Sequence, residues 1–325
     1  MIFFFAIEKK CRIFPMTHVY LRVAYVNYWT DPVNDKYFTQ FLQHHFGDKF
    51  EILEVPHTSS PDILISSVFG NLSYIRKINA KIKIFFTGEN LNRKEYSSFS
   101  NKKTLANYFD IVLGFDDTDV EYKIYKFPLW LIYFKFYDMK RDDNVISFIE
   151  REHVKNRHGL RRKFCTLVAR HDRSGIRSKI VRAVNKIGNV SFGGPFRLNG
   201  KACDQIIPSG SNHKIEYIKE SVYNICPENS SNRGYCTEKL FEALQAGCIP
   251  IYWGSSIPKE LNEEKIIMYN AIDEDSFLKN FEIGNDRDFD GPVFTSEGRS
   301  MVSRYYDDFK KRLDHFINTR ISDIP

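Results

Sequence analysis

Strand-like and helix-like segments alternate along most of this chain, and that alternation restricts its fold more than any other feature. Runs rich in β-branched and aromatic residues predict strands over residues 19–28, 50–55, 62–69, 81–87 and 109–114. Apolar residues recur at helical spacing over residues 35–46, and a short helix-like stretch separates segments 62–69 and 81–87. Strands with helices between them predict parallel βαβ units, so we expect an open α/β sheet.

The alternation restarts after a stretch of mixed charge at residues 138–163, where we expect a linker. The second series predicts strands over residues 164–169, 189–192, 222–226 and 249–253, with helices over 175–187, 212–220 and 238–246. A length of 325 residues also suits about two domains. We therefore predict two Rossmann-like α/β domains, at residues 1–150 and 151–325, that face each other across a cleft.

The composition indicates a folded protein with a mild basic surplus. Hydrophobic residues make up 42% and aromatic residues 15% of the chain, which argues against disorder. The formal net charge is +6, but the basic residues are not grouped into the dense blocks that mark nucleic-acid tails. The charge suits an anionic ligand or an anionic membrane surface, and we expect no nucleic-acid partner.

The cysteines and the N-terminal residues both point to a reducing compartment. Six cysteines occur without any CxxC pair, a usage typical of free, mostly buried thiols. The apolar residues 1–7 are followed at once by charges, fall far short of a membrane span of about 20 residues, and lack the basic region of a signal peptide. We therefore expect a soluble cytoplasmic protein.

A polar loop between a predicted strand and a predicted helix carries the first candidate site. The loop holds Glu228 and Asn229, and Thr237 can cap the helix that follows. Lys239 lies in the first turn of that helix, where a cation opposes the helix dipole by about 0.3 to 1 kcal/mol. Lys239 by itself could be an ordinary solvated charge, but a bound anion would compensate it.

A second cationic helix start favours the anion. Arg173 and Arg177 flank the start of the helix that follows the strand at 164–169. Two such helix starts after parallel strands predict a phosphate site at the carboxyl edge of one sheet. Glu238, beside Lys239, is either a favourable first-turn acid or a carboxylate that accepts hydrogen bonds from sugar or ribose hydroxyls.

Glu89 is the candidate base of the first half. The strand at 81–87 leads into Gly88 and Glu89 at its carboxyl end, where open α/β sheets place their ligands. A single glutamate after a strand is more often a turn or cap residue, so spacing alone leaves Glu89 a candidate.

The acidic pairs argue against a metal cofactor. Asp-x-Asp occurs at Asp117/Asp119, Asp273/Asp275, Asp286/Asp288 and Asp288/Asp290. Four copies in turn-like contexts indicate solvated loops rather than one metal site, and no Cys/His zinc cluster, Walker A loop or GxGxxG motif occurs. We therefore expect no metal ligands and no cofactor.

These segments resemble the α-1,3/4-fucosyltransferases of glycosyltransferase family 10. The main match is Glu228-Asn-Ser with Gly234-Tyr-Cys-Thr-Glu-Lys239, ending in Pro250-Ile-Tyr-Trp-Gly254. Further matches in the family's order are Phe86-Thr-Gly-Glu-Asn90, Phe127-Pro-Leu-Trp-Leu131 and Gly175-Ile-Arg177. The family usually has an aliphatic residue at the position of Cys236. The chain looks like a compact bacterial or viral-type member, without the membrane anchor and stem of animal members or the heptad repeats of some bacterial ones.

The resemblance implies a GT-B fold and transfer of L-fucose from GDP-fucose, with inversion, to a GlcNAc-containing glycan. In that fold residues 1–150 would form the acceptor-binding domain and residues 151–325 the GDP-fucose-binding domain. It implies that Glu89 is the general base and that Arg177 and Lys239 neutralise the diphosphate, with no obligatory metal. Glu238 would hold the ribose. Asn229 and Tyr235 would contact the diphosphate or the fucose.

Several alternatives stay open at this point. The nucleotide sugar could differ, or the chain could be a catalytically inactive glycan-binding homologue. The acceptor could be a free oligosaccharide or a lipid-linked glycan. Residues 299–317 place apolar side chains on one helical face, which predicts packing against the N-terminal domain or contact with a membrane surface.

Overall fold

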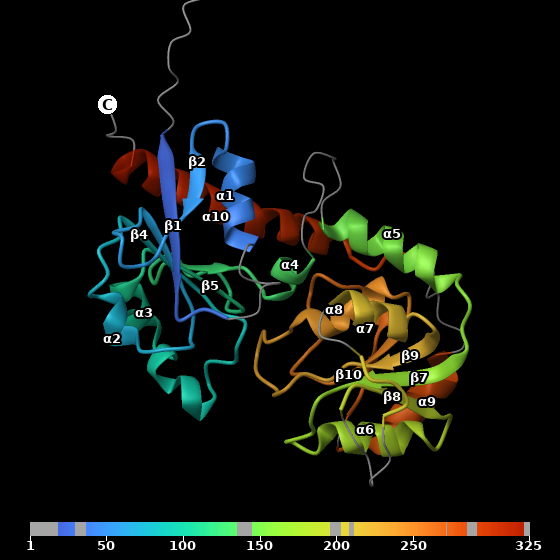
Figure 1. Ribbon diagram of the computed structural model, residues 1–325. Helices are drawn as coiled ribbons and strands as arrows, with labels where there is room; N and C mark the ends of the chain where they lie inside the picture. The colour runs from blue at the N-terminus through green and yellow to red at the C-terminus, as the bar shows by residue number, and fades with distance from the viewer. Residues whose placement is uncertain are drawn as a thin grey trace, which may run out of the picture.

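The computed structural model describes residues 19–29, 37–134, 145–195, 203–207, 211–270, 272–284 and 291–321. Its framework is two separate sheets, drawn in Figure 1. The first sheet has six strands in the order β2-β1-β3-β4-β5-β6, and all neighbours are parallel. Its strands are β1 (Tyr20–Val26), β2 (Glu51–Glu54), β3 (Ile63–Ser66), β4 (Ile82–Phe86), β5 (Ile111–Gly114) and β6 (Ile124–Lys126).

The second sheet has five strands in the order β11-β10-β9-β7-β8, again with parallel neighbours. Its strands are β7 (Lys163–Val168), β8 (Val190–Gly193), β9 (Ser221–Ile225), β10 (Ile249–Tyr252) and β11 (Ile267–Met268). The predicted pair of Rossmann-like α/β units is confirmed. Most successive strands are joined through helices that return the chain across a face of the sheet, while β2–β3 and β5–β6 are joined by loops.

Helices cover both faces of the first sheet, and the side chains of β4 show why. Ile82, Ile84 and Phe86 point into the core shared with α1 (Tyr37–Phe46), whereas Phe85 points to the other face. That second face is covered by the short helices α2 (Leu72–Ile75), η1 (Lys94–Phe99) and α3 (Lys102–Tyr108). Successive strand residues alternate between faces, so an apolar run such as β4 supplies two cores at once.

The second sheet is covered in the same way. The helices α6 (Ile176–Val184) and α9 (Glu274–Gly284) contribute to one core, with Ile180 and Phe277 fully buried beside Leu167 of β7. The helices α7 (Ser211–Ile218) and α8 (Glu238–Gln245) pack together on the other face.

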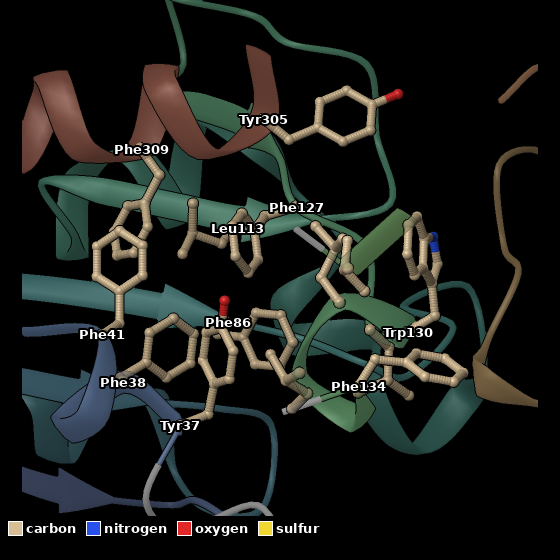
Figure 2. Packing of buried hydrophobic residues seen from close by; sticks show 14 of the residues in the cluster. Tyr37, Phe38, Phe41, Phe86, Leu113, Phe127, Trp130, Phe134, Tyr305 and Phe309 are labelled. Carbon is tan, nitrogen blue, oxygen red and sulfur yellow. The ribbon is translucent and has the colours of Figure 1, made fainter. Parts of the chain in front are cut away.

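The C-terminal helix α10 (Ser296–Arg320) runs from the second unit back across the first sheet (Figure 1). Its apolar face is buried, and Phe309 packs against Phe38, Phe41 and Phe127, as Figure 2 shows. Because the first sheet covers this face, it is not available to a membrane surface. Among the described residues, no helix is both long and apolar enough to cross a bilayer.

The expected linker contains a helix that the sequence pattern did not reveal. The longer helix α5 (Val145–Arg157) contains the predicted domain boundary at residue 150. Both α5 and the short helix α4 (Trp130–Tyr133) pack against α8. The apolar residues of α5 are few and stand among charges, but Ile146, Ile149 and His153 follow helical spacing and are buried. Trp130 stacks on Phe241 of α8 with ring centroids 4.0 Å apart, which joins the two units in one core.

Arg161, which follows α5, connects three parts of the chain through hydrogen bonds to backbone carbonyl groups. Its guanidinium donates to the carbonyl oxygens of Asn156 at 2.6 Å, Ser221 at 2.7 Å and Gly247 at 2.8 Å. Gly247 has a φ of +69°, and a Cβ there would lie 2.7 Å from the Arg161 guanidinium. The planar guanidinium of arginine carries several N–H donors that point in different directions. It can therefore bind carbonyl groups that a single lysine ammonium cannot reach together.

We expect Arg161→Lys to lower the free energy of unfolding by about 1.5 to 3 kcal/mol, since carbonyls that accepted charged hydrogen bonds lose them. Arg162→Lys, at the exposed neighbouring position, is the matched control and is expected to change stability little. Urea unfolding followed by circular dichroism measures both. Equal stability of the two variants would contradict the role given to Arg161.

Candidate active site

The loop between β9 and α8 is organised by a buried carboxylate. Glu228 is fully buried, and its two oxygens accept hydrogen bonds from the Thr237 backbone N–H and the Thr237 hydroxyl, both at 2.7 Å. The predicted capping role of the Thr237 side chain is wrong. Thr237 occupies the N-cap position of α8, but its hydroxyl donates to Glu228 and makes no capping hydrogen bond to the helix.

Lys239 is compensated by the protein's own carboxylates. Its ammonium lies 2.7 Å from the Thr237 hydroxyl, 3.2 Å from Glu238 Oε1 and 3.5 Å from Glu228 Oε2. Burial disfavours its charge, but Glu238 and Glu228 outweigh burial and hold the pKa of Lys239 well above its ordinary value. The compensation that the sequence led us to expect from a bound anion is thus supplied in part by Glu238 and Glu228.

Glu238 lies between two lysines. Burial disfavours its charge, but Lys239 and Lys214 outweigh that effect and lower the pKa of Glu238. Lys214 in α7 is paired directly with Glu242, one turn further along α8. Glu238 therefore favours its charged form and lies beside the Lys239 ammonium.

Arg177 is the buried member of the second predicted cationic pair. Its guanidinium donates to the His171 carbonyl at 2.8 Å and to Asn229 Oδ1 at 2.9 Å. Arg173, by contrast, is exposed. Asp172, which the sequence reading did not use, accepts hydrogen bonds from the N–H groups of Arg177 and Ser178 and so caps the start of α6.

The two helix starts meet because their strands are neighbours. β7 leads to α6 and β9 leads to α8, and these strands pair directly. Asn229 accepts a hydrogen bond from Arg177, and Glu228 accepts one from Lys239. These two acceptors are consecutive residues of the chain. The structure thus brings Arg177, Asn229, Glu238 and Lys239 together at the carboxyl edge of the second sheet.

Tyr235 lies at the contact between the two units. Only 3% of it is exposed, and its ring packs edge-on against Phe115, which follows β5, at 5.0 Å. Burial raises the pKa of Tyr235, so its hydroxyl stays protonated and can donate a hydrogen bond. Lys239, Glu228, Glu89 and Glu238 act electrostatically on this tyrosine.

Glu89 reaches the same region from the first sheet. The loop after β4 holds it: its N–H donates to Thr87 Oγ1 at 3.0 Å, and its carboxylate lies 3.6 Å from Arg93. Burial raises the pKa of Glu89, Arg93 and Lys239 oppose that rise, and the net pKa lies above the ordinary value of a glutamate. Gly88 beside it leaves room for the Leu129 side chain, since a Cβ at this position would lie 2.4 Å from Leu129 Cδ1.

Four polar side chains bridge the two units next to Glu89. Asn90 donates to Ser230 Oγ at 2.9 Å and accepts from Asn232 at 3.2 Å, while Asn92 donates to Asn232 Oδ1 at 3.0 Å. We call these residues the asparagine clasp. The sequence reading missed them, because partners about 140 positions apart leave no local spacing signal.

A pocket between the units is lined by Thr87, Glu89 and Asn90 from the first and by Asn232 and Tyr235 from the second. Glu89 and Tyr235 line this pocket, and the Lys239 ammonium acts electrostatically on both of them, while the Arg177 guanidinium acts on Tyr235. A poised carboxylate can accept a proton, and paired cations can hold an anionic group.

Where the structure describes them, the acidic pairs lie in a surface loop after β5 and at the start of α9. Asp117 and Asp119 pair with Lys126 and Lys102, and Asp273 and Asp275 are exposed. The pairs Asp286/Asp288 and Asp288/Asp290 lie outside the described residues. Within the described ranges no three His, Cys, Asp or Glu side chains gather as metal ligands.

Two family models match the chain in succession. Residues 23–133 match the model described as the Alpha-(1,3)-fucosyltransferase FucT N-terminal domain. Residues 157–282 match Glycosyltransferase family 10 (fucosyltransferase) C-term. The first match ends at α4 and the second begins at the end of α5, and together they cover more than two thirds of the chain.

A curated relative, the Alpha-(1,3)-fucosyltransferase FucT of Helicobacter pylori, is 28% identical over 335 aligned residues, 91% of this chain. The chain spans 65% of that relative's length. A solved alpha1,3-fucosyltransferase with GDP-fucose has a TM-score of 0.56 at 20% identity and covers 94% of each chain. An alpha-glucosyltransferase in complex with UDP has a TM-score of 0.51 at 11% identity, with 91% of this chain and 98% of that one covered.

These likenesses agree with the architecture of the two sheets. The solved structures share the arrangement of two facing parallel-sheet units, so the predicted GT-B fold is confirmed. The two family models divide the chain as its two sheets do. The chain belongs to glycosyltransferase family 10.

Proposed function

We propose that the protein is an inverting α-1,3-fucosyltransferase that transfers L-fucose from GDP-fucose to a GlcNAc-containing glycan. The observation that carries the proposal is that Glu89 of one unit and Tyr235 of the other line the same pocket, with Lys239 and Glu238 as electrostatic neighbours of Glu89. The similar solved proteins include alpha1,3-fucosyltransferases with GDP and with GDP-fucose, and the curated relative carries the same activity in its name.

In the proposed reaction, the acceptor hydroxyl attacks the anomeric carbon of fucose as its bond to the diphosphate oxygen breaks. Glu89 takes the hydroxyl proton, and GDP leaves with the bonding electrons. Arg177 and Lys239 stabilise the negative charge that develops on the diphosphate, the usual source of the largest rate gain. Tyr235 can donate to the same oxygens from the interface.

Asn229 and Glu238 serve this reaction mainly by holding the cations. Asn229 Oδ1 aims the Arg177 guanidinium, and Glu238 Oε1 lies beside the Lys239 ammonium. A carboxylate has about four acceptor positions, so Glu238 can accept from a ribose hydroxyl while it keeps Lys239 in place.

Direct assay of transfer tests the proposal against its alternatives. The protein is incubated with GDP-fucose and with N-acetyllactosamine, a type 1 chain or chitobiose, and NMR identifies the product and its linkage. Thermal-shift ranking of GDP-fucose, GDP-mannose and UDP-sugars separates another nucleotide sugar from the proposed one. Glycan binding without turnover on any donor would indicate an inactive homologue.

We also propose a cytoplasmic location. Four buried cysteines, Cys165, Cys226, Cys236 and Cys248, are free thiols, as reducing compartments favour. Contact with a membrane surface stays a prediction that rests on the net charge of +6, since the apolar face of α10 lies in the core.

Glu89→Gln should lower turnover by about 100-fold or more, because the amide keeps the size of the side chain and removes the proton acceptor. GDP affinity should hardly change, since the cations belong to the other unit. The base acts when deprotonated, so wild-type activity should fall as the pH drops through the raised pKa of Glu89. A Glu89→Gln enzyme that turns over at the wild-type rate would remove this residue from the mechanism.

Arg177→Ala and Lys239→Ala should each weaken GDP binding by about 10- to 150-fold, the loss of one charged contact of about 1.5 to 3 kcal/mol. Lys239→Ala should also lower the free energy of unfolding by about 3 to 5 kcal/mol, because it leaves Glu228 buried without its cation. Calorimetry and urea unfolding measure the two effects.

Lys179→Ala is the matched control for these variants, since Lys179 is exposed on the same helix as Arg177. It should change neither property. If both test variants fold and bind GDP as tightly as this control, the two cations do not hold the diphosphate.

Transfer should persist in EDTA, because Arg177 and Lys239 supply the positive charge that a divalent cation supplies elsewhere. Turnover is measured after chelation and again after Mn²⁺ is added. Loss of activity on chelation with recovery on Mn²⁺ would show that the leaving group depends on a metal.

A further inference from the structure

Three aromatic side chains form a row at the carboxyl edge of the first sheet. Trp29 follows β1, Phe69 follows β3, and Tyr96 lies in η1 after β4. Ring centroids are 5.1 Å apart for Trp29 and Phe69 and 6.2 Å apart for Phe69 and Tyr96. We call these residues the aromatic row. Phe69 is 42% exposed, and the other two rings are half-buried.

The aromatic row ends at Glu89. The Arg93 guanidinium lies 5.6 Å from the centroid of the Tyr96 ring and 3.6 Å from Glu89 Oε2. The aromatic row, the Arg93 guanidinium and the Glu89 carboxylate are therefore successive neighbours in space.

Buried aromatic residues of the first core hold the aromatic row in place. Trp29 contacts Phe86 at 5.6 Å and Tyr28 at 4.9 Å, and both of these residues are buried in the first core. A platform fixed by the core presents its rings with little loss of side-chain freedom on binding.

The chemistry of this surface fits a neutral oligosaccharide. A pyranose ring has an apolar face of C–H groups and a polar rim of hydroxyls. Aromatic rings can cover the apolar face, while Arg93 and a carboxylate can bond the rim. Ligand sites combine aromatic lining with a few placed polar groups in this way, whereas single exposed aromatics are ordinary surface.

We propose that the aromatic row is the acceptor subsite, which binds the sugar units adjoining the accepting hydroxyl. This inference rests on the proposed function. The glycan runs from Glu89 over Tyr96 and Phe69 toward Trp29, so that its terminal units stack while one hydroxyl reaches the carboxylate. Recognition is of the sugar chain itself, whether it is free or joined to a lipid.

The test compares Phe69→Ala and Phe69→Leu with Phe69→Trp, which restores a ring. The control is Tyr20→Ala, because Tyr20 is 46% exposed at the amino end of β1, on the opposite sheet edge. For N-acetyllactosamine we expect KM to rise about 2- to 12-fold in the first two variants, the worth of one aromatic contact, with kcat and GDP affinity unchanged. Phe69→Trp and Tyr20→Ala should keep the wild-type KM.

Saturation-transfer NMR with N-acetyllactosamine, in the presence of GDP, measures acceptor binding without turnover. Binding that weakens in Phe69→Ala and Phe69→Leu but not in Tyr20→Ala supports the subsite, even if no fucose is ever transferred. That result would separate a failure of the proposed function from a failure of the subsite. Equal binding by wild type and folded Phe69 variants, or no binding by wild type, would overturn the aromatic row as the acceptor site.

Discussion

The burial of one carboxylate determines most of the geometry of the candidate site. An ionised Glu228 without partners would be strongly unfavourable in the interior, and its pKa is raised by that burial. The Thr237 N–H, the Thr237 hydroxyl and the Lys239 ammonium together satisfy it. These contacts decide where α8 begins and where Lys239 lies. Since Asn229 is the next residue along the chain, they also place the partner of Arg177.

The second requirement is that two sheets present their carboxyl edges to each other. The stacked pair Trp130 and Phe241 is apolar and non-directional, so it brings the units together without choosing an exact alignment. The asparagine clasp supplies that alignment, because hydrogen bonds are directional and Asn90 directly follows Glu89. The apolar contacts thus hold the two units together, and the polar contacts fix how the units are aligned.

Charge balance within the site bears on how the proposed donor binds. Glu228 is an electrostatic neighbour of both Arg177 and Lys239, and Glu238 of Lys239, so these carboxyl groups offset part of the positive charge. A diphosphate would then draw on the helix N-termini and their N–H groups as well as on the two cations. The ion pairs of Lys239 and the hydrogen bonds of Arg177 also hold both cations in place before a ligand arrives, which lowers the entropic cost of binding.

The sequence by itself determined the strand and helix pattern, the parallel sheets and the two cationic helix starts. These features depend on residues close along the chain, and periodicity and helix polarity express them directly. It also marked Glu89, Arg177 and Lys239, since each follows a recognisable strand. Only the tertiary structure decided that Thr237 serves Glu228 and not its helix, that α5 packs on α8, and that Asn90 meets Ser230. Those outcomes depend on which distant side chains compete for the same hydrogen bonds and the same buried space, and no local pattern records that competition.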